Sequence, residues 1–381
     1  MTAPFLPFAK PFIDESMIAA VADTLRSRWL VTGARAAAFE KALSERFAGR
    51  PVRAVTSATA AMQLALELLD IGPGDEVITP AQTFFVTGNV IERAGATTVF
   101  VDVELRSRNL RLDQADAAVT PRTRLLLPTH FNAPIDPQAL SDFARRHGVR
   151  ILEDAALAVG SRAGGREVGS TGDLVAFSFH PNKNMTTIEG GAIVLNDDRE
   201  AAIVDELRFH GIRRLPDGTR DVARAGAKFN FSDVSARLGL EQLARLDEWC
   251  RTRAALATHY FACLEGDELL TPERLPPQDN PGHSWNMFTV LLPLGEMALT
   301  RKEFIDAMQR EGIGLGISYE AVHLTTVFRA KGFREGQFPV SERIARETVT
   351  LPLHPEMAPS DVERVCETAG RVLRSGHRRT A

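Results

Sequence analysis

Short apolar segments alternate with amphipathic helical patterns through the first half of the chain, and this alternation restricts the fold more than any other feature. The expected strands cover residues 54–56, 76–79, 97–102, 125–127 and 150–154. Strands that alternate with helices form a mostly parallel sheet covered by helices on both faces. Ligands of such sheets bind beyond the carboxyl ends of the strands. We therefore expect an α/β fold whose functional residues follow its strands.

The chain has 381 residues, enough for two or three structural units. Residues 1–15 carry three prolines and three phenylalanines without a helical or strand period, as in an arm laid over another surface, and a partner subunit is one candidate for that surface. We expect a large domain over residues 16–245 and a smaller one over 246–381, bridged by a long helix at 232–264. The other expected elements are helices at 16–26, 36–47, 199–207 and 301–309, strands at 174–179, 192–195, 287–292 and 314–319, and a last helix from residue 359.

Charge and hydropathy narrow the possible partners and the compartment. The formal net charge is -4 and the pI is near 6.2, so neither nucleic acid nor a membrane surface is expected as a partner. No apolar run approaches the roughly 20 residues of a spanning helix, and the start of the chain lacks a signal-peptide pattern. We expect a cytoplasmic protein. The arginines around an irregular stretch at 209–226 indicate local anion handling or a solvated face; they are Arg208, Arg213, Arg214, Arg220 and Arg224.

The three cysteines, Cys250, Cys263 and Cys366, are odd in number and lack the spacing of metal ligands. A disulfide framework and a metal site are therefore not expected.

Lys183 lies between two apolar runs, 174–179 and 192–195, that are both expected to be buried strands. It should therefore lie on a short connection inside the domain. Burial of an ammonium is costly unless the group is paired or neutral, and desolvation lowers a lysine pKa toward the range of an amine nucleophile. Schiff-base chemistry is one interpretation, and a lysine on a surface loop is the other.

Other polar residues lie where strands or helices end. Ser57 and Thr59 separate a strand from a helix, so they would present free N–H groups to a phosphate or would simply cap the helix. Asp154 follows a strand and is either a functional carboxylate or another cap. Residues 29–33 form an expected turn that carries an aromatic side chain, a hydroxyl group and a glycine, and a ligand could bind there.

Together these residues supply the parts of a pyridoxal phosphate site. Lys183 would hold the aldehyde of the cofactor. Asp154 would keep the pyridine nitrogen protonated, since an ion pair at about 4 Å contributes on the order of 4 kcal/mol at an effective dielectric near 20. Phe84 would stack on the ring. The phosphate would be held by Ser57, Thr59 and Ser178.

The motifs that carry these residues resemble those of the DegT/DnrJ/EryC1/StrS sugar aminotransferases, which are fold-type I pyridoxal phosphate enzymes. The resemblance covers nearly the whole chain, through residues 29–33, 56–61, 72–80, 153–156, 177–184, 189–191 and 228–233. It implies a three-layer αβα large domain with a mostly parallel sheet and a smaller α+β C-terminal domain. It also implies a homodimer with both active sites at the interface, where the segment 228–230 reaches the neighbour's cofactor phosphate.

The resemblance assigns a set of site residues. Lys183 is the catalytic lysine. The implied cofactor-binding residues are Ser57, Ala58, Thr59, Phe84, Asp154, Leu157, Ser178, Lys183, Lys228 and Asn230. The implied substrate-binding residues are Trp29, Thr32, His180, His210, Tyr319 and His323. The stretches 283–288 and 312–314 leading to His323 look like the branch that aminates nucleotide-linked 4-keto sugars.

Leu157 departs from the family pattern, which has Gln or His three residues after the aspartate. A leucine cannot donate a hydrogen bond to the phenolic oxygen of the cofactor, a bond worth roughly 1.5–3 kcal/mol when a charged group takes part. The side chains of His180 or Asn184, or an ordered water, are the candidate replacements. A smaller departure is Ile188, where relatives often have Gly.

We expect an aminotransferase that moves an amino group from an L-amino acid, glutamate in the first place, to a nucleotide-linked keto sugar. Pyridoxamine phosphate would be the intermediate form of the cofactor, and the pathway would make cell-surface polysaccharide or amino and deoxy sugars. One alternative is a keto-sugar dehydratase, but relatives of that kind replace the lysine by histidine. The other is a cofactor-binding regulator or scaffold without turnover, which Leu157 alone supports.

Overall fold

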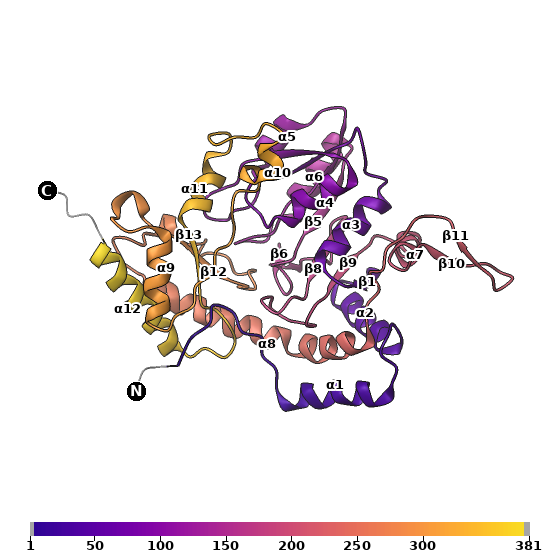
Figure 1. Ribbon diagram of the computed structural model, residues 1–381, viewed down its shortest axis with the longest axis horizontal. Helices are drawn as coiled ribbons and strands as arrows, with labels where there is room; N and C mark the ends of the chain where they lie inside the picture. Colours follow the sequence, from indigo (N-terminus) through magenta and orange to yellow (C-terminus); the bar gives the residue numbers. More distant parts are fainter. Residues whose placement is uncertain (1–3, 377–381) are drawn as a thin grey trace.

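A seven-stranded sheet forms the centre of the larger part of the computed structural model, which describes residues 4–376 (Figure 1). Its strand order is β1-β9-β8-β5-β4-β2-β3. All of its strands run parallel except β9, which is antiparallel to both of its neighbours. The strands are β1 Val52–Val55, β2 Glu76–Pro80, β3 Thr97–Val101, β4 Thr123–Leu126, β5 Arg150–Asp154, β8 Leu174–Ser178 and β9 Gly191–Val194.

Helices cover both faces of this sheet, because successive strand residues point to opposite sides and both sides are apolar. In β4, Leu125 packs in the core formed with α3, α4 and α7, whereas Leu126 packs in the core formed with α5 and α6. The third core joins β1, β8 and β9 to α2 and α8. The predicted three-layer αβα arrangement is confirmed. The helices of this part are α1 Glu15–Ser27, α2 Ala34–Arg46, α3 Ala58–Leu68, α4 Val86–Ala94, α5 Leu112–Ala118, α6 Pro137–His147, α7 Asp198–Leu207 and α8 Asp233–Cys263.

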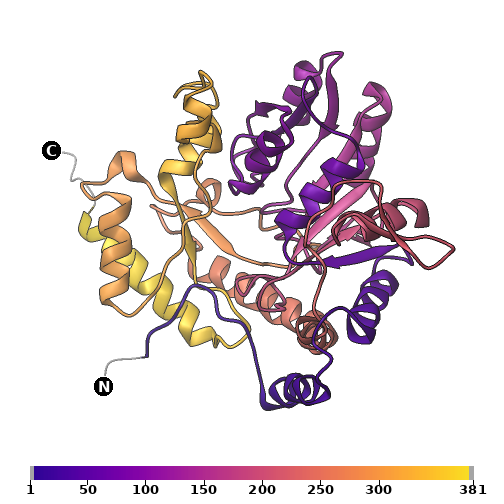
Figure 2. The ribbon, with the colours of Figure 1, turned by 45° about the vertical axis from the view of Figure 1, so that its right-hand side comes forward.

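A smaller part with its own core follows α8, and Figure 2 shows it beside the sheet. Two antiparallel strands, β12 Phe288–Leu291 and β13 Thr348–Leu351, pack with helices and with the second half of α8. This is the predicted α+β C-terminal unit. Its helices are α9 Arg301–Arg310 and α12 Pro359–Gly376, and its 3-10 turns are Pro272–Arg274 and Leu294–Glu296. The 3-10 turn Val322–Leu324 and α10 Thr326–Arg329 pack against Ala81 and Phe100 of the larger part, and α11 Pro339–Glu347 packs against Val103 and Leu291.

Helix α8 belongs to both parts. At 1.5 Å per residue its 31 residues span about 46 Å. Leu246 packs in the core against the sheet, whereas Leu256 and Tyr260 pack in the smaller core. The predicted domain boundary at 245/246 falls inside this helix and stays a prediction. No helix within residues 4–376 has the length and apolar character needed to cross a membrane.

The arm at residues 4–14 lies against its own chain. The N–H of Leu6 donates to the carbonyl of Gly312 (2.8 Å), and the carbonyl of Leu6 accepts from the N–H of Gly314 (2.8 Å). The carbonyl of Phe12 accepts from the side chain of Gln242 on α8 (2.7 Å). Residues 1–3 of the predicted arm lie outside the described residues.

Three local predictions differ from the structure. Residues 314–319 form no strand, because Gly316 pairs with Thr350 only through an isolated bridge. The strand that does pair with β12 is β13, at residues for which the sequence predicts no helix or strand. The stretch 209–226, expected to be irregular, contains the antiparallel strands β10 Ile212–Arg214 and β11 Arg220–Val222, which project from the molecule in Figure 1. Two further short strands, β6 Arg162–Ala163 and β7 Arg166–Glu167, pair with each other.

Gly191 allows the first residue of β9 to lie directly against the start of α3. A Cβ atom at this position would lie 2.4 Å from the carbonyl carbon of Ser57 and 2.5 Å from the nitrogen of Ala58. Both neighbours are backbone atoms and cannot rotate away. The glycine therefore fixes how closely the sheet approaches the helix that begins at Ala58.

We expect Gly191→Ala to lower the free energy of unfolding by about 1–3 kcal/mol, because the added methyl forces the strand and the helix apart. The measurement is urea unfolding followed by circular dichroism. Gly295→Ala is the matched control, since a Cβ there meets no atom within 4 Å. Equal unfolding midpoints for both variants would contradict this account of the contact.

Candidate active site

One cavity lies beyond the carboxyl ends of five parallel strands, and its volume is about 210 Å³. Each of β1, β2, β4, β5 and β8 contributes a polar residue at or just after its end. These residues are Ser57, Thr83, Thr129, Asp154 and Ser178. The rest of the lining is Ala58, Thr59, Phe84, Val86, Ala156, Leu157, His180, Asn182, Lys183, Glu189, Gly190 and Tyr319.

Lys183 reaches the cavity from the loop between β8 and β9. Its N–H donates to the carbonyl of His180 (2.9 Å), which closes a turn and leaves the side chain only partly exposed. Burial lowers the pKa of Lys183 to about 8, and the attraction of the Asp154 carboxylate opposes this shift. The amine is therefore neutral at a much lower pH than that of a solvated lysine.

Asp154 is the last residue of β5 and is buried. Its carboxylate accepts the N–H of Ala156 (3.0 Å), and its backbone is bound to Pro128 and His130 of the neighbouring chain segment. Burial raises the pKa of Asp154, while the hydrogen bond from Ala156 and the charge of Lys183 lower it. A cationic group placed in the cavity would offset the cost of burying this carboxylate.

The start of α3 forms another side of the cavity. The hydroxyl of Ser57 accepts the N–H of Ala60 (3.0 Å), so Ser57 is the N-cap of the helix. The N–H groups of Ala58 and Thr59 belong to the first turn, which carries the positive end of the helix dipole. The positive end of the dipole would attract an anion placed here, whether Ser57 contacts the anion or only caps the helix.

Aromatic and apolar side chains complete the wall. Phe84 is 50% exposed, and its ring centroid lies 5.3 Å from that of Tyr319. Tyr319 also packs edge-on against Phe131 (5.6 Å). Leu157 is buried in the same small cluster as Phe131 and Met287. An exposed ring beside such a wall suits a flat aromatic ligand.

Five of the predicted site residues do not line this cavity; they are Trp29, Thr32, His210, Lys228 and Asn230. The exposed ammonium of Lys228 donates a hydrogen bond to the side-chain oxygen of Asn230 and lies 4.6 Å from the centroid of the Phe209 ring. His210 is the residue that follows Phe209. Asn230 in turn donates to the Thr32 hydroxyl (2.7 Å). Trp29 is 60% exposed and lines a separate surface groove with Asp233.

His323 does not reach the cavity either. It is fully buried, its Nε2 lies 3.1 Å from a carboxylate oxygen of Glu342, and its ring packs against Phe338. Burial lowers the pKa of His323, and Glu342 opposes the shift. His180 does line the cavity, where its Nδ1 lies 2.9 Å from the side-chain oxygen of Asn182.

Four polar lining residues were missed in the sequence analysis: Thr83, Thr129, Asn182 and Glu189. The hydroxyls of Thr83 and Thr129 share a hydrogen bond of 3.0 Å. Both follow strands of the predicted sheet, so the rule that placed Asp154 at a strand end would have included them. Asn182 and Glu189 flank Lys183 on its loop, and both lie within the motifs that carry the family resemblance, 177–184 and 189–191.

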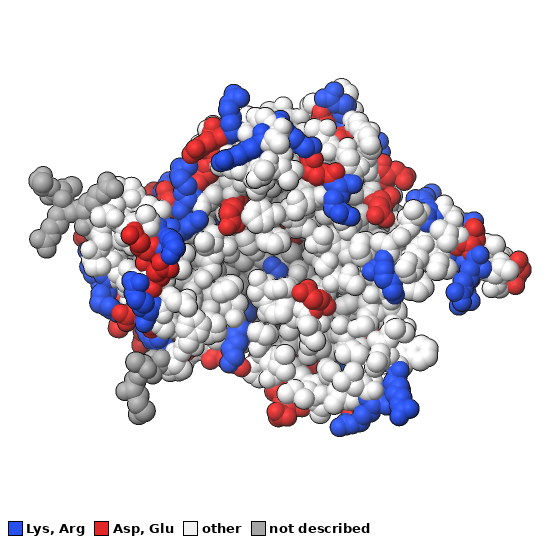
Figure 3. Space-filling model, in the orientation of Figure 1, with Lys and Arg blue, Asp and Glu red and all other residues white. Residues whose placement is uncertain are grey.

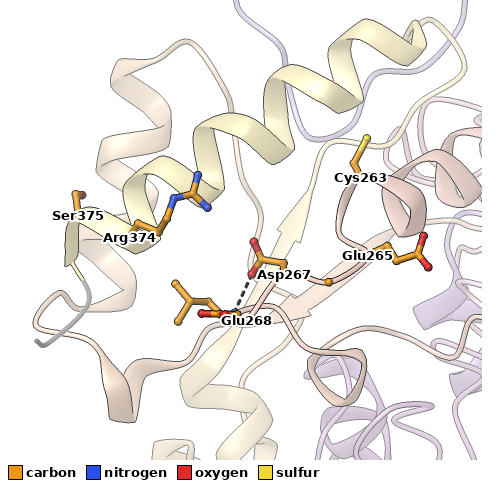
Figure 4. A pocket seen from close by; sticks show the side chains of 8 residues that line it. Cys263, Glu265, Asp267, Glu268, Arg374 and Ser375 are labelled. Carbon is orange, nitrogen blue, oxygen red and sulfur yellow. Dashed lines mark hydrogen bonds between the residues drawn. The ribbon is translucent and has the colours of Figure 1, made fainter. Parts of the chain in front are cut away.

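A wider cavity lies elsewhere, where α8 and α12 end (Figure 4). Its described lining consists of Cys263, Glu265, Gly266, Asp267, Glu268, Leu269, Arg374 and Ser375. Asp267 caps the local turn by accepting the N–H of Leu269 (2.9 Å).

Acidic and basic side chains are mixed over the face seen in Figure 3. No cluster of His, Cys, Asp and Glu within residues 4–376 is arranged to hold a metal ion.

Competitive labelling of the protein with acetic anhydride, read by mass spectrometry, measures the neutral fraction of each lysine. We expect the labelling of Lys183 to rise with pH with its inflection near about 8, because burial lowers the pKa of this lysine. Asp154→Asn should shift this inflection to lower pH, since the carboxylate raises the pKa of the lysine. The exposed Lys302 is the internal control. An inflection of Lys183 at the pH of Lys302, or an upward shift in Asp154→Asn, would overturn the assignment.

Comparison with known proteins supports the predicted family. The sequence model of the DegT/DnrJ/EryC1/StrS aminotransferase family matches residues 11–369. The Streptococcus pneumoniae protein Spr1654, assigned as a sugar aminotransferase, has a similar structure in its PMP form, with a TM-score of 0.91 at 28% identity, covering 97% of this chain and 99% of that one. DesV of S. venezuelae (TM-score 0.88, 32% identity) and the aminotransferase TlmJ of Streptoalloteichus hindustanus (0.89, 31%) also cover 97% of this chain and 99% of their own. This likeness confirms the fold-type I architecture, and the family match over nearly the whole length shows that the chain belongs to the DegT/DnrJ/EryC1/StrS aminotransferase family.

Proposed function

We propose that this aminotransferase uses pyridoxal phosphate to move an amino group from an L-amino acid, glutamate in the first place, to a keto sugar carried on a nucleotide. The observation that carries the proposal is the pairing, in one cavity, of a lysine of lowered pKa with a buried carboxylate. Family membership supplies the reaction class. The stretches 283–288 and 312–314 support the nucleotide-sugar substrate by their resemblance to the branch that aminates such sugars.

The chemistry of the lining fits pyridoxal phosphate. Lys183 would hold the cofactor covalently through its amine, and Asp154 would pair with the protonated pyridine nitrogen. The first turn of α3 with Ser57 and Thr59, and Ser178 on the facing strand, would hold the phosphate. Phe84 presents an exposed ring on which the pyridine can stack.

When bound, the cofactor supplies an electron sink that stabilises negative charge on the carbon undergoing proton transfer. Asp154 keeps that sink effective, because a buried carboxylate favours a protonated pyridine nitrogen beside it. The amine of Lys183, whose pKa is lowered to about 8, would accept and donate the proton that moves at the Cα of the donor. The apolar side chains of Leu157, Val86 and Phe84 limit the access of water to this transfer.

We assign Lys228 and Asn230 to the cavity of a second copy of the chain in a homodimer. Both residues lie outside the cavity of their own chain, and Lys228 is exposed although it is bonded to Asn230. The apolar run Trp29, Leu30 and Val31 is also exposed, at 43–64%. A second copy that covers this run would bury apolar area and bring the Lys228 ammonium to a phosphate.

The function is tested by incubating purified holoenzyme with glutamate and then with a panel of nucleotide-linked keto sugars, with absorbance and mass spectrometry as readouts. We expect glutamate to convert the cofactor to pyridoxamine phosphate and one sugar to be aminated. Lys183→Ala should lose at least about 10²–10⁴-fold in rate and should yield no borohydride-reducible adduct. Lys302→Ala, which removes an exposed lysine, is the matched control. A normal rate or an adduct in Lys183→Ala refutes the lysine, and failure of glutamate with wild-type holoenzyme favours the regulatory alternative.

Mixing two inactive variants tests the shared site. A dimer of Lys183→Ala with Lys228→Ala would hold one intact site and one doubly substituted site, so refolded equimolar mixtures should recover about a quarter of the wild-type activity in a symmetric dimer. Lys183→Ala mixed with Asp154→Ala is the control and should recover nothing, because both residues line the cavity of the same chain. Equal recovery in the two mixtures, or a fully active monomer in sedimentation, would end the proposal.

A further inference from the structure

We propose that the phenol of Tyr319 donates to the phenolic oxygen of the cofactor the hydrogen bond that Leu157 cannot make. This inference rests on the proposed function and concerns how this chain compensates for its departure from the family pattern. Leu157 lies in the cavity wall and is buried with Phe131 and Met287, so it presents only hydrocarbon to the cavity. A negatively charged oxygen against such a wall would lose the hydrogen bonds that it makes in water.

The two side chains first considered as replacement donors, Asn184 and His180, are placed less favourably than Tyr319. Asn184 does not line the cavity: its amide nitrogen donates to the carbonyl of Ser284 (3.0 Å), and its oxygen accepts from Asn286 (3.3 Å). His180 is exposed, and its Nδ1 lies 2.9 Å from the Asn182 side chain. Asn184 is therefore excluded as the donor, and His180 lies in the exposed part of the lining and not in the apolar cluster around Leu157.

The hydroxyl of Tyr319 makes no hydrogen bond to residues 4–376 and is not closed off from solvent, and Tyr319 belongs to the lining of the cavity. Its ring lies in contact with the cluster that contains Leu157 and is next to the exposed Phe84 ring. An accessible phenol in the lining of a cavity is free to donate to a ligand bound there. Tyr319 and Leu157 thus belong to the same apolar cluster and to the same cavity lining.

The backbone at Tyr319 is held firmly. The carbonyl of Ser318 accepts from the buried guanidinium of Arg108 (2.7 Å), and the Ser318 hydroxyl accepts from Thr350 (2.8 Å). The carbonyl of Tyr319 accepts from Gln82, which precedes the cavity residues Thr83 and Phe84 (3.4 Å). The ring is therefore placed by contacts to both parts of the molecule, and a donor fixed in advance loses little entropy when the ligand binds.

The protonation state suits a donor. Burial and the negative charges of Asp154 and Glu320 raise the pKa of Tyr319 above its ordinary value of 10. The phenol therefore keeps its proton at neutral pH and can donate it to an anionic oxygen.

The test is a double-substitution cycle on holoenzyme, with two readouts: the affinity for pyridoxal phosphate, and the pH titration of the absorbance of the lysine-bound cofactor. Tyr319→Phe should weaken binding by about tenfold, which corresponds to about 1.4 kcal/mol, and should shift the titration. Leu157→Gln restores the donor of the family pattern, so it should return both quantities toward wild type in the Tyr319→Phe background. In the wild-type background it should tighten binding by a smaller factor, because the two donors serve one oxygen.

Tyr260→Phe is the control, because the chain has only these two tyrosines and the Tyr260 hydroxyl donates to the carbonyl of Pro352 inside the smaller core. It should change neither readout. Unchanged affinity and titration in Tyr319→Phe, a weakening that Leu157→Gln does not repair, or a weakening matched by a lower unfolding temperature of the cofactor-free protein would each overturn the inference. Wild-type protein that binds no pyridoxal phosphate would instead overturn the proposed function.

Discussion

The active site depends on two buried groups that line the same cavity, the amine of Lys183 and the carboxylate of Asp154. Neither group can be removed without leaving the other buried and uncompensated, which is costly in a medium of low dielectric. The parallel sheet makes this arrangement possible. Its strand ends bring Asp154 from β5 and the loop after β8, with Lys183, to the same edge, while helices on both faces exclude solvent from the strands themselves.

The sequence predicts most of this arrangement because the decisive signals are local. Period and alternation identify the strands, and each strand end then identifies its polar residue, as for Ser57, Asp154 and Ser178. The predictions fail where structure depends on distant partners. Residues 314–319 have the composition of a strand, yet β12 pairs with β13 instead, and no local signal distinguishes the two. The positions of His323 and Lys228 relative to the cavity depend on tertiary packing in the same way.

Leu157 illustrates how an apolar substitution at a polar position changes the demands on its neighbours. The residue itself packs well, with Phe131 and Met287 around it, and costs the fold nothing. What changes is the solvation of any charged atom placed beside it. The sequence alone shows only that a hydrogen-bond donor is missing at this position. In the structure, the phenol of Tyr319, about 160 positions further along the chain, lines the same cavity.

Helix α8 runs without a break through two hydrophobic cores, one under the sheet and one in the smaller part. Rotation of one part against the other would have to bend this helix, and the sequence from Asp233 to Cys263 contains no proline at which a sharp kink would be easy. The unbroken α8 therefore links the aromatic wall at Tyr319 to the part that carries Lys183, so the width of the cavity depends on a helix that contributes no residue to the cavity lining.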